Sequence, residues 1–298
     1  MNINNFITFD IEEWFHANYE EVNGKETSAG RGLQVSQYDA TSTNLESNVD
    51  CLIDLCAEYG VKSTCFILGD VAKNKPYVVK KLFEAGHEIA SHGMSHKLIY
   101  PMTPEEFSTD LRTSSAILEQ ITGQKVVGFR APSWSVKRDT LPWFYEILAQ
   151  ESFLYSSSIY PAKNTIFGIP NFPVTPHYPT SNLVLEIPQS VMNLFGNKVG
   201  YAGGGYLRFF PIWLIKQQIR KNNKEGKPIF IYAHPREIDI HQPRLKLGVM
   251  DGYFHYQGIG GCEEKLSSLL KEFQHSFIRM DEYALKSQVI LGTLPKRT

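Results

Sequence analysis

Apolar residues along the chain fall into short continuous runs that alternate with longer segments of helical period. The runs predict buried strands at residues 3–9, 61–68, 88–91, 126–129, 152–155, 228–233 and 277–279. The helical spacing predicts helices at residues 44–59, 76–85, 103–122, 138–150, 211–225 and 262–273. Repeated strand–helix units over this length favour a parallel barrel or a doubly wound sheet.

The helix expected at residues 103–122 has the clearest ends. Thr103 and Glu106 have the spacing of a capping box, and Pro104 occupies the first helical position. Gly123 supplies the stop signal.

The segment from about residue 157 to 205 departs from this rhythm. It is rich in Pro, Asn and Gly and contains only short β-like pieces, such as residues 183–187. Long irregular stretches in compact domains tend to build binding surfaces. We therefore expect one domain over residues 1–298, with an irregular, substrate-shaping insertion at about 157–205 before the last strands.

Polar residues follow several of the expected strands. Asp10 and Glu12 follow the first strand, His92 the strand at 88–91, Arg130 the strand at 126–129, and His234 the strand at 228–233. In parallel barrels the chemistry lies at the carboxyl ends of the strands. The sequence thus predicts that these five side chains gather at one edge.

His92 and His96 are the most informative pair. If the intervening residues form a helical turn, this spacing places both imidazoles on one face, where they can bind one cation. Histidine pairs at this spacing are more often ordinary core or surface residues. The nearby strand-end acids Asp10 and Glu12 favour a His-His-carboxylate metal site.

Composition narrows the functional class. The chain has 298 residues, of which 42% are hydrophobic, as in an ordinary globular protein. Its net charge of -1 provides no positive electrostatic field that would attract nucleic acid. Aromatic residues make up 12%, which suits a sugar-stacking groove but also an ordinary barrel core. No basic segment followed by an apolar run opens the sequence, and no apolar run reaches the ~18–20 residues of a membrane span. These features favour a cytoplasmic protein.

The cysteines lack the spacing of a metal site or of a disulfide framework. We expect buried free thiols, which suit a reducing compartment, at Cys51, Cys56, Cys65 and Cys262.

Four ordered motifs resemble those of the polysaccharide deacetylase family, the NodB-homology group of carbohydrate esterase family four. They are Thr8-Phe-Asp-Ile-Glu-Glu-Trp14, Ser91-His-Gly-Met-Ser-His96, Arg130-Ala-Pro-Ser-Trp134 and Ile231-Tyr-Ala-His234. Three further pieces resemble the bacterial subgroup associated with exopolysaccharide and envelope glycans: Gly203-Gly-Gly-Tyr206, His234-Pro-Arg-Glu-Ile-Asp239 and Gln242-Pro-Arg244.

The resemblance implies a distorted (β/α) barrel that removes N-acetyl groups from amino sugars with one divalent metal ion. Zn²⁺ is the expected ion, and Co²⁺, Ni²⁺ or Fe²⁺ also suit such a site. By the same resemblance His92 and His96 are metal ligands, Asp10 is the general base and Arg130 holds that base. His234 is the general acid.

The third metal ligand has two candidates. Many family members have adjacent acids, whereas here Ile11 separates Asp10 from Glu12. Period-two alternation keeps Asp10 and Glu12 on one strand face, which favours Glu12. Glu13 competes if the strand has already turned.

The chain departs from the family at Ser156, where many relatives have an aspartate that keeps the acid histidine protonated. Glu237 or Asp239 could replace that carboxylate, because a nearby negative charge raises the pKa of a histidine. If neither carboxylate does so, the pKa of the acid histidine is less strongly raised, or the substrate differs from chitin-like glycans.

Trp134 is the first candidate for the sugar groove, although it would be unremarkable as a core residue. Trp14, Tyr206 and Tyr160 are further candidates. The expected partner is an N-acylated sugar of an envelope glycan or of its lipid- or nucleotide-linked precursor. Two alternatives remain open: a deformylase or other amide or ester hydrolase, and a catalytically silent sugar-binding module. The sequence does not determine the oligomeric state.

Overall fold

One curled sheet of parallel strands organises the protein. The computed structural model describes residues 3–16, 43–163, 168–181, 184–244 and 249–290. Within these residues the sheet has seven strands in the order β6-β5-β4-β3-β2-β1-β9, and all of its pairings are parallel. The strands are β1 (Phe6–Ile11), β2 (Thr64–Ile67), β3 (Glu88–Ser91), β4 (Gly128–Phe129), β5 (Tyr155–Ser156), β6 (Leu185–Glu186) and β9 (Phe230–Ala233).

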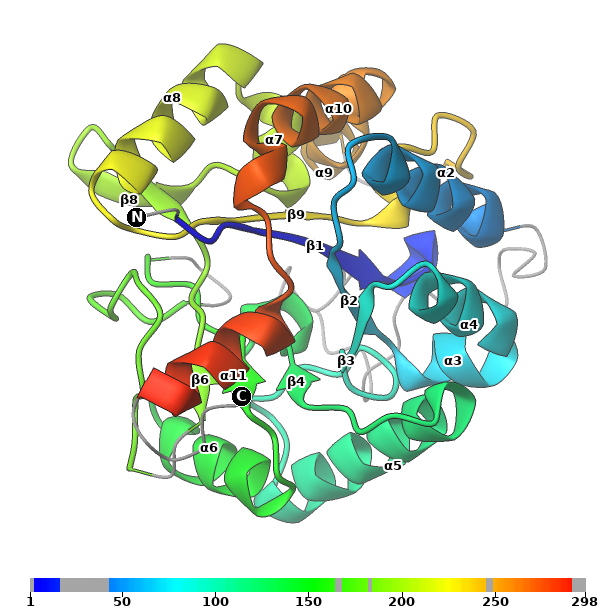
Figure 1. Ribbon diagram of the computed structural model, residues 1–298, viewed down its shortest axis with the longest axis vertical. Coiled ribbons are helices and arrows are strands. Elements are labelled where there is room, and N and C mark those ends of the chain that lie inside the picture. The colour runs from blue at the N-terminus through cyan, green and yellow to red at the C-terminus, as the bar shows by residue number, and fades with distance from the viewer. Residues whose placement is uncertain (1–2, 17–42, 164–167, 182–183, 245–248, 291–298) are drawn as a thin grey trace.

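Helices surround the outer side of this sheet (Figure 1). They are α2 (Leu45–Glu58), α3 (Gly69–Asn74), α4 (Pro76–Glu84), α5 (Pro104–Thr122), α6 (Leu141–Gln150), α7 (Gly204–Phe209), α8 (Ile212–Lys224), α9 (Val249–Tyr256), α10 (Cys262–Phe273) and α11 (Met280–Ile290). Among the described strands, β6 and β9 are the two edges and do not pair with each other. This arrangement confirms the expected distorted (β/α) barrel.

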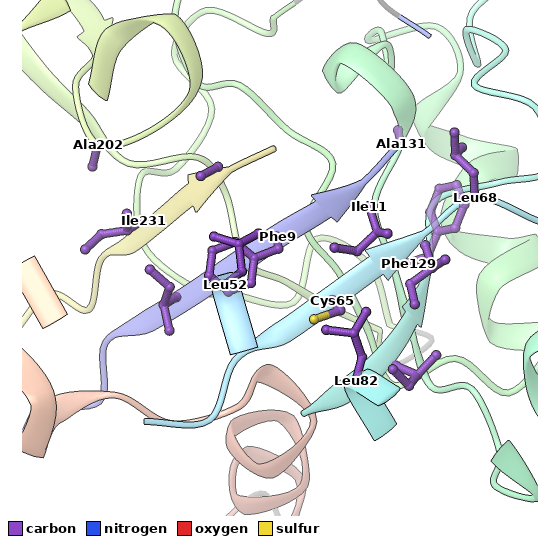
Figure 2. Close-up of a cluster of buried hydrophobic side chains, with 14 of the residues drawn as sticks. Phe9, Ile11, Leu52, Cys65, Leu68, Leu82, Phe129, Ala131, Ala202 and Ile231 are labelled. Atoms are coloured by element: carbon purple, nitrogen blue, oxygen red, sulfur yellow. The ribbon is translucent and has the colours of Figure 1, made fainter. Parts of the chain in front are cut away.

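The two faces of β1 explain how a buried strand can also carry chemistry. Phe9 and Ile11 belong to the cluster between sheet and helices, which also contains Leu52 of α2 and Cys65 of β2 (Figure 2). Because side chains alternate along a strand, the intervening Asp10 points to the opposite, inner face. The outer apolar layer therefore fixes which residues of the strand reach the interior.

The second half of the chain contains elements that the sequence did not reveal. Residues Val191–Leu194 and Asn197–Gly200 form the antiparallel hairpin β7–β8. The two turn residues, Phe195 and Gly196, both have positive φ. The usual sequence signal for such a turn is Asn-Gly, so a turn with phenylalanine in the first position is not recognised from the sequence. The β-like piece expected at 183–187 is the shorter β6, and Leu183 lies outside the described residues.

The expected strand at 277–279 is wrong. Phe277 makes a single parallel bridge with Asn5, and the chain then enters α11. The hydroxyl of Thr64 accepts a hydrogen bond from the Met280 amide, and Glu88 accepts one from the Asp281 amide. Because side chains accept these amide hydrogen bonds, the segment begins a helix instead of extending the sheet.

The prediction of buried free thiols is confirmed for Cys56, Cys65 and Cys262 and is wrong about the burial of Cys51. All four cysteines are free thiols; Cys51 is partly exposed and the other three are buried. In the described residues no helix is both long and apolar enough to cross a membrane.

An aromatic cluster packs α5 and α6 onto the sheet and gives a first prediction. The fully buried Phe107 contacts Phe129 of β4 and Phe144 of α6, with ring centroids 5.4 and 5.3 Å away. Phe107→Ala should lower the free energy of unfolding by about 3–5 kcal/mol, measured by urea denaturation. Phe195→Ala, which truncates a side chain that is 95% exposed, is the control and should change it by less than about 0.5 kcal/mol.

The buried Glu88 gives a second prediction. It accepts hydrogen bonds from Tyr155, Thr64 and the Asp281 amide, while burial and the nearby Asp281 raise the pKa of its carboxyl to about 8. The folded protein therefore binds a proton that the unfolded chain releases above its ordinary pKa. The contribution of Glu88 to stability is greatest below that ordinary pKa and falls as pH rises toward about 8.

Glu88→Gln should flatten the loss of stability between about pH 5 and pH 8, where only the wild-type residue titrates. Thermal unfolding across this range measures it. Parallel curves for the two proteins would contradict the role given to Glu88.

Candidate functional site

The ends of β1 and β3 bring the first site residues together. Asp10 lies within β1 and Glu12 directly after it, and both side chains are almost fully buried. His92 directly follows β3, and its amide donates a hydrogen bond to the carbonyl of Ile67 at 3.0 Å, which continues the ladder with β2. The sheet register thus places the acidic segment beside the histidine segment.

Glu12, His92 and His96 form a buried cluster whose candidate ligand atoms lie within 4.8 Å of one another. Among the described residues, Glu12 Oε2 accepts no hydrogen bond of normal geometry, although His96 Nε2 lies 3.0 Å away. His92 Nδ1 lies 2.9 Å from the carbonyl oxygen of Arg130. With Nδ1–H donating to that oxygen, Nε2 keeps a free lone pair for a metal.

The backbone between the histidines differs from the helical turn expected from their spacing. Residues 92–96 are not helical, and Gly93 and His96 have φ of 77° and 59°. Asp110 of α5 accepts a hydrogen bond from the Met94 amide at 2.9 Å. A side chain at position 93 would place its Cβ only 3.0 Å from the Asp110 carboxylate, so the close approach requires glycine there. The histidines therefore meet because α5 shapes a tight loop, and not because of helical periodicity.

Glu12 is ionised in this cluster, and His92 is neutral. Burial by itself raises the pKa of Glu12, but His96, His234 and Arg236 outweigh it and hold the pKa well below its usual range. Burial lowers the pKa of His92 to about 4. A carboxylate and a neutral imidazole are the protonation states that metal binding requires.

Arg130 and Asp10 form an ion pair inside the barrel. Arg130 Nη1 lies 2.6 Å from Asp10 Oδ1, and the arginine is completely buried. The same nitrogen donates to Thr8 Oγ1 at 2.9 Å, and Nη2 donates to Ser157 Oγ at 3.1 Å. The guanidinium carbon lies 4.0 Å from the centre of the Phe66 ring. Arg130 thus fixes the Asp10 carboxylate from the side of the core.

His234 lies opposite, directly after β9. Its Nε2 is 3.8 Å from Asp10 Oδ2 and 3.7 Å from Glu12 Oε1. Burial lowers the pKa of this imidazole, but Glu12 and Glu237 outweigh it, so the pKa is raised overall. The base candidate and the acid candidate therefore face the same small volume.

Of the two carboxylates considered beside His234, the structure places Glu237 there. Glu237 Oε2 lies 3.3 Å from His234 Nδ1. Burial raises the pKa of Glu237, yet His234 and Arg208 outweigh it and hold the pKa at about 2. Asp239 instead accepts hydrogen bonds from Asn44 and from Asn48 in α2.

The position expected for the missing aspartate is also buried. Ser156 donates a hydrogen bond to Ser158 Oγ at 2.8 Å. Glu186 of β6, which sequence reasoning missed, accepts hydrogen bonds from the amides of Ser158 and Ile159 at 2.9 Å each. It thereby anchors the loop that contacts Arg130. An isolated glutamate in an irregular segment gave no signal of this role.

Two further residues near the cluster were not predicted to be in the site. His16, in the 3-10 helix Trp14–His16, stacks with His96 at 6.4 Å between ring centroids, and burial lowers its pKa to about 4. Arg236 Nε lies 3.8 Å from Glu12 Oε1. By contrast Glu13, the rival third ligand, pairs with Lys75 at 2.7 Å.

The aromatic candidates for the sugar groove are more buried than expected. Trp134 is 7% exposed and meets Tyr232 edge-on at 4.6 Å between ring centroids. Trp14 and Tyr160 are 3% and 1% exposed. The Tyr160 hydroxyl accepts a hydrogen bond from the Gly200 amide and lies 3.4 Å from the hydroxyl of the partly buried Tyr206. The contact of these four residues with a sugar stays a prediction.

Two family models match the chain in succession. Residues 34–144 match the polysaccharide deacetylase family, and residues 157–285 match a domain of unknown function, DUF3473. The sheet crosses this boundary, because β2, β3 and β4 come from the first region and β6 and β9 from the second, while β1 and β5 lie outside both.

Curated relatives match over short regions. The chain is 30% identical to the peptidoglycan deacetylase-like protein FGM2 of Gibberella zeae over 127 residues, covering 42% of this chain and 36% of that protein. It is 28% identical to the peptidoglycan deacetylase of Helicobacter pylori over 114 residues, covering 38% of each chain. The matches thus span little more than a third of these relatives.

Solved structures agree with the fold over nearly the whole chain. A polysaccharide deacetylase described as probable from Pseudomonas aeruginosa has a TM-score of 0.63 and 20% identity, covering 96% of this chain and 91% of its own. PuuE allantoinase has a TM-score of 0.64 and 18% identity, covering 97% and 91%. At such identities the likeness establishes the fold alone. Residues 34–144 match the polysaccharide deacetylase family, and the fold of the described residues agrees with that match.

Proposed function

We propose that this protein is a metal-dependent hydrolase that removes N-acetyl groups from the amino sugars of a bacterial envelope glycan. The observation that carries the proposal is the convergence of three devices at one edge of the sheet. These are the Glu12–His92–His96 cluster, the Asp10–Arg130 ion pair and His234. A binding module needs no base, no anchor for a base and no acid.

The donor set fits a divalent metal. Two imidazoles and one carboxylate form a donor set that suits Zn²⁺, and three protein ligands leave a position for water or substrate. Glu12, His92 and His96 would hold the ion. When bound, it lowers the pKa of a nearby water and polarises the scissile carbonyl.

The side chains of the site can perform the remaining steps of amide hydrolysis. Asp10 takes a proton from the attacking water as its oxygen bonds to the carbonyl carbon. His234 donates a proton to the amide nitrogen as the carbon–nitrogen bond breaks, giving acetate and a primary amine. Arg130 orients the Asp10 carboxylate, because Thr8 and Ser157 accept hydrogen bonds from the same guanidinium and hold it in place.

The substrate class rests on relatives and on the insertion. The curated relatives are named for peptidoglycan, a polymer of N-acetylated amino sugars. The motifs of the second half resemble those of the exopolysaccharide-associated subgroup, and the region at about 157–205 supplies Tyr160, a candidate for contact with the sugar. We therefore propose an N-acetylated exopolysaccharide, O-antigen or lipid- or nucleotide-linked precursor as the substrate.

The first test combines metal content with turnover. His92→Ala should lose the bound metal, measured by elemental analysis, because it removes one of three ligands. Asp10→Asn should keep the metal and lower kcat on N-acetylglucosamine oligomers by about 10²–10⁴-fold.

His275→Ala, which changes an exposed histidine far along the sequence, is the control and should alter neither quantity. Full metal occupancy in His92→Ala would refute the ligand assignment. Near-normal turnover in Asp10→Asn would refute the base.

A second test separates the leading function from the two alternatives. Wild-type protein is incubated with N-acetylated, N-formylated and O-acetylated sugars, and both the released acid and the new amine are quantified. Acetate with an equal amount of amine is the expected result. Formate, or acetate without amine, would identify the other hydrolases, and metal binding without any release would favour the silent module.

A further inference from the structure

Large apolar side chains are exposed on a group of neighbouring helices. Trp213 at the start of α8 is 64% exposed, and Phe209 of α7 is also exposed. On α9 the exposed Val249 and Tyr253 are four residues apart and therefore share one face of the helix, and the next residue, Phe254, is exposed as well. Single exposed apolar residues are ordinary, whereas several on adjacent elements mark an interaction surface.

Hydrogen bonds establish that α7 and α9 are neighbours. Nη2 of the buried Arg208 donates to the carbonyl of Phe254 at 3.3 Å, and Nη1 donates to the carbonyl of Gln257 at 2.8 Å. Phe209 directly follows this arginine, and α8 begins three residues later. The helices α7, α8 and α9 lie together at the upper end of the molecule in Figure 1. Their five exposed apolar side chains form what we call the apolar patch.

The chain that leads into and through α8 is basic. Residues 187–224 contain six lysines and arginines and no aspartate or glutamate. Arg220, Lys221 and Lys224 are exposed near the end of α8. They follow Trp213 by seven, eight and eleven residues, which places all of them on one side of the helix. The exposed side of α8 therefore begins with an aromatic residue and ends with cations.

Nearby acidic side chains neutralise only part of this charge. Glu272 of α10 pairs with Arg220 at 2.5 Å. Glu225, directly after α8, pairs with Lys227 at 2.6 Å. Both acids are thus engaged with other cations, and the end of α8 keeps two exposed lysines.

The apolar patch adjoins the edge of the sheet that carries the site. Arg208, the neighbour of Phe209, lies with its Nε 3.1 Å from Glu237 Oε1. Glu237 Oε2 in turn lies 3.3 Å from the ring of His234. Two buried side chains therefore connect the patch to the candidate acid, and a surface that contacts the patch would lie at the same end of the sheet as the site.

The surface of an anionic lipid bilayer fits this combination of side chains. Tryptophan, tyrosine and phenylalanine favour the boundary between headgroups and acyl chains. Lysines beside such aromatic residues are attracted to anionic headgroups. Protein interfaces are instead depleted in lysine, and a neutral glycan would not use the cations.

We propose that the apolar patch and the lysines at the end of α8 dock this protein on an anionic lipid bilayer. The docking does not depend on the proposed function. Its consequence for the substrate rests on that function: an N-acetylated amino sugar linked to a membrane lipid would be favoured over a nucleotide-linked one, because docking brings the site to the lipid.

The first test uses native fluorescence with vesicles of phosphatidylcholine and phosphatidylglycerol. Of the four tryptophans, Trp14 and Trp134 are buried, Trp143 is partly buried and Trp213 is exposed. Vesicles with brominated acyl chains should quench and blue-shift the emission of wild type but not of Trp213→Phe. Pure phosphatidylcholine should give a weaker effect. Absence of quenching with the anionic vesicles would overturn the proposal.

The second test measures apparent Kd by co-sedimentation with the anionic vesicles. Trp213→Ser/Phe254→Ser should weaken binding by at least about 10-fold, and Lys221→Gln/Lys224→Gln by about 10–30-fold. The matched control on α4 is Tyr77→Ser/Lys80→Gln, which also removes one exposed aromatic ring and one exposed lysine, and it should bind like wild type.

An equal loss in the α4 control would mean unspecific adsorption and would overturn the proposal. A second copy of the chain is the rival occupant, so sedimentation without lipid is measured in parallel. A dimer that Trp213→Ser/Phe254→Ser abolishes, together with no vesicle binding, would assign the patch to that copy instead.

The third test addresses the substrate. On N-acetylglucosamine joined through a diphosphate to a polyprenol in anionic vesicles, Trp213→Ser/Phe254→Ser should raise KM by about 10-fold with kcat within about two-fold. On soluble N-acetylglucosamine oligomers it should match wild type. Equal KM on the vesicle substrate would refute the preference for a lipid-linked sugar. If wild type hydrolyses neither substrate, the proposed function fails, while the vesicle tests still decide the docking.

Discussion

The buried ion pair between Arg130 and Asp10 is the interaction on which the arrangement of the site depends. An arginine at the centre of a barrel is tolerable only if its donors are satisfied, and here Thr8, Asp10 and Ser157 accept from it. These partners lie on β1 and directly after β5, on opposite sides of β4 in the sheet order. The hydrogen bonds of this one guanidinium therefore fix β1 and the segment after β5 relative to each other. They also fix Asp10, the candidate base, because it is one of the acceptors.

The other side of the site repeats this solution with different residues. The guanidinium of Arg208 donates hydrogen bonds to Glu237 and to a carbonyl at the carboxyl end of α9. Glu237 in turn contacts the ring of His234. Each candidate proton-transfer group is thus backed by a buried arginine, directly for Asp10 and through a carboxylate for His234. Glu12 of the candidate metal cluster lies 3.7 Å from His234, measured from its Oε1 to the ring Nε2. Such preorganisation lets a site act without rearranging its own charges.

The boundary between the two matched regions does not divide the chemistry. The region at 34–144 supplies His92, His96 and Arg130, whereas the region at 157–285 supplies His234 and its supports. Asp10 and Glu12 precede both regions. Neither region could assemble the site alone, because β1 pairs with β2 on one side and with β9 on the other. A single sheet is what joins them.

The sequence by itself determined the outer layer, most helices and the set of strand-end polar residues. Period-two and helical patterns are local, so apolar alternation in β1 already separates Phe9 from Asp10. Tertiary structure decided the rest. The His92–His96 loop is shaped by Asp110 of α5, and Glu13 is drawn away by Lys75. Glu186 accepts a hydrogen bond from the Ser158 amide, and Arg208 donates one to Glu237, in each case to a residue distant in the sequence. No local pattern records such contacts, because their partners meet only when the sheet has formed.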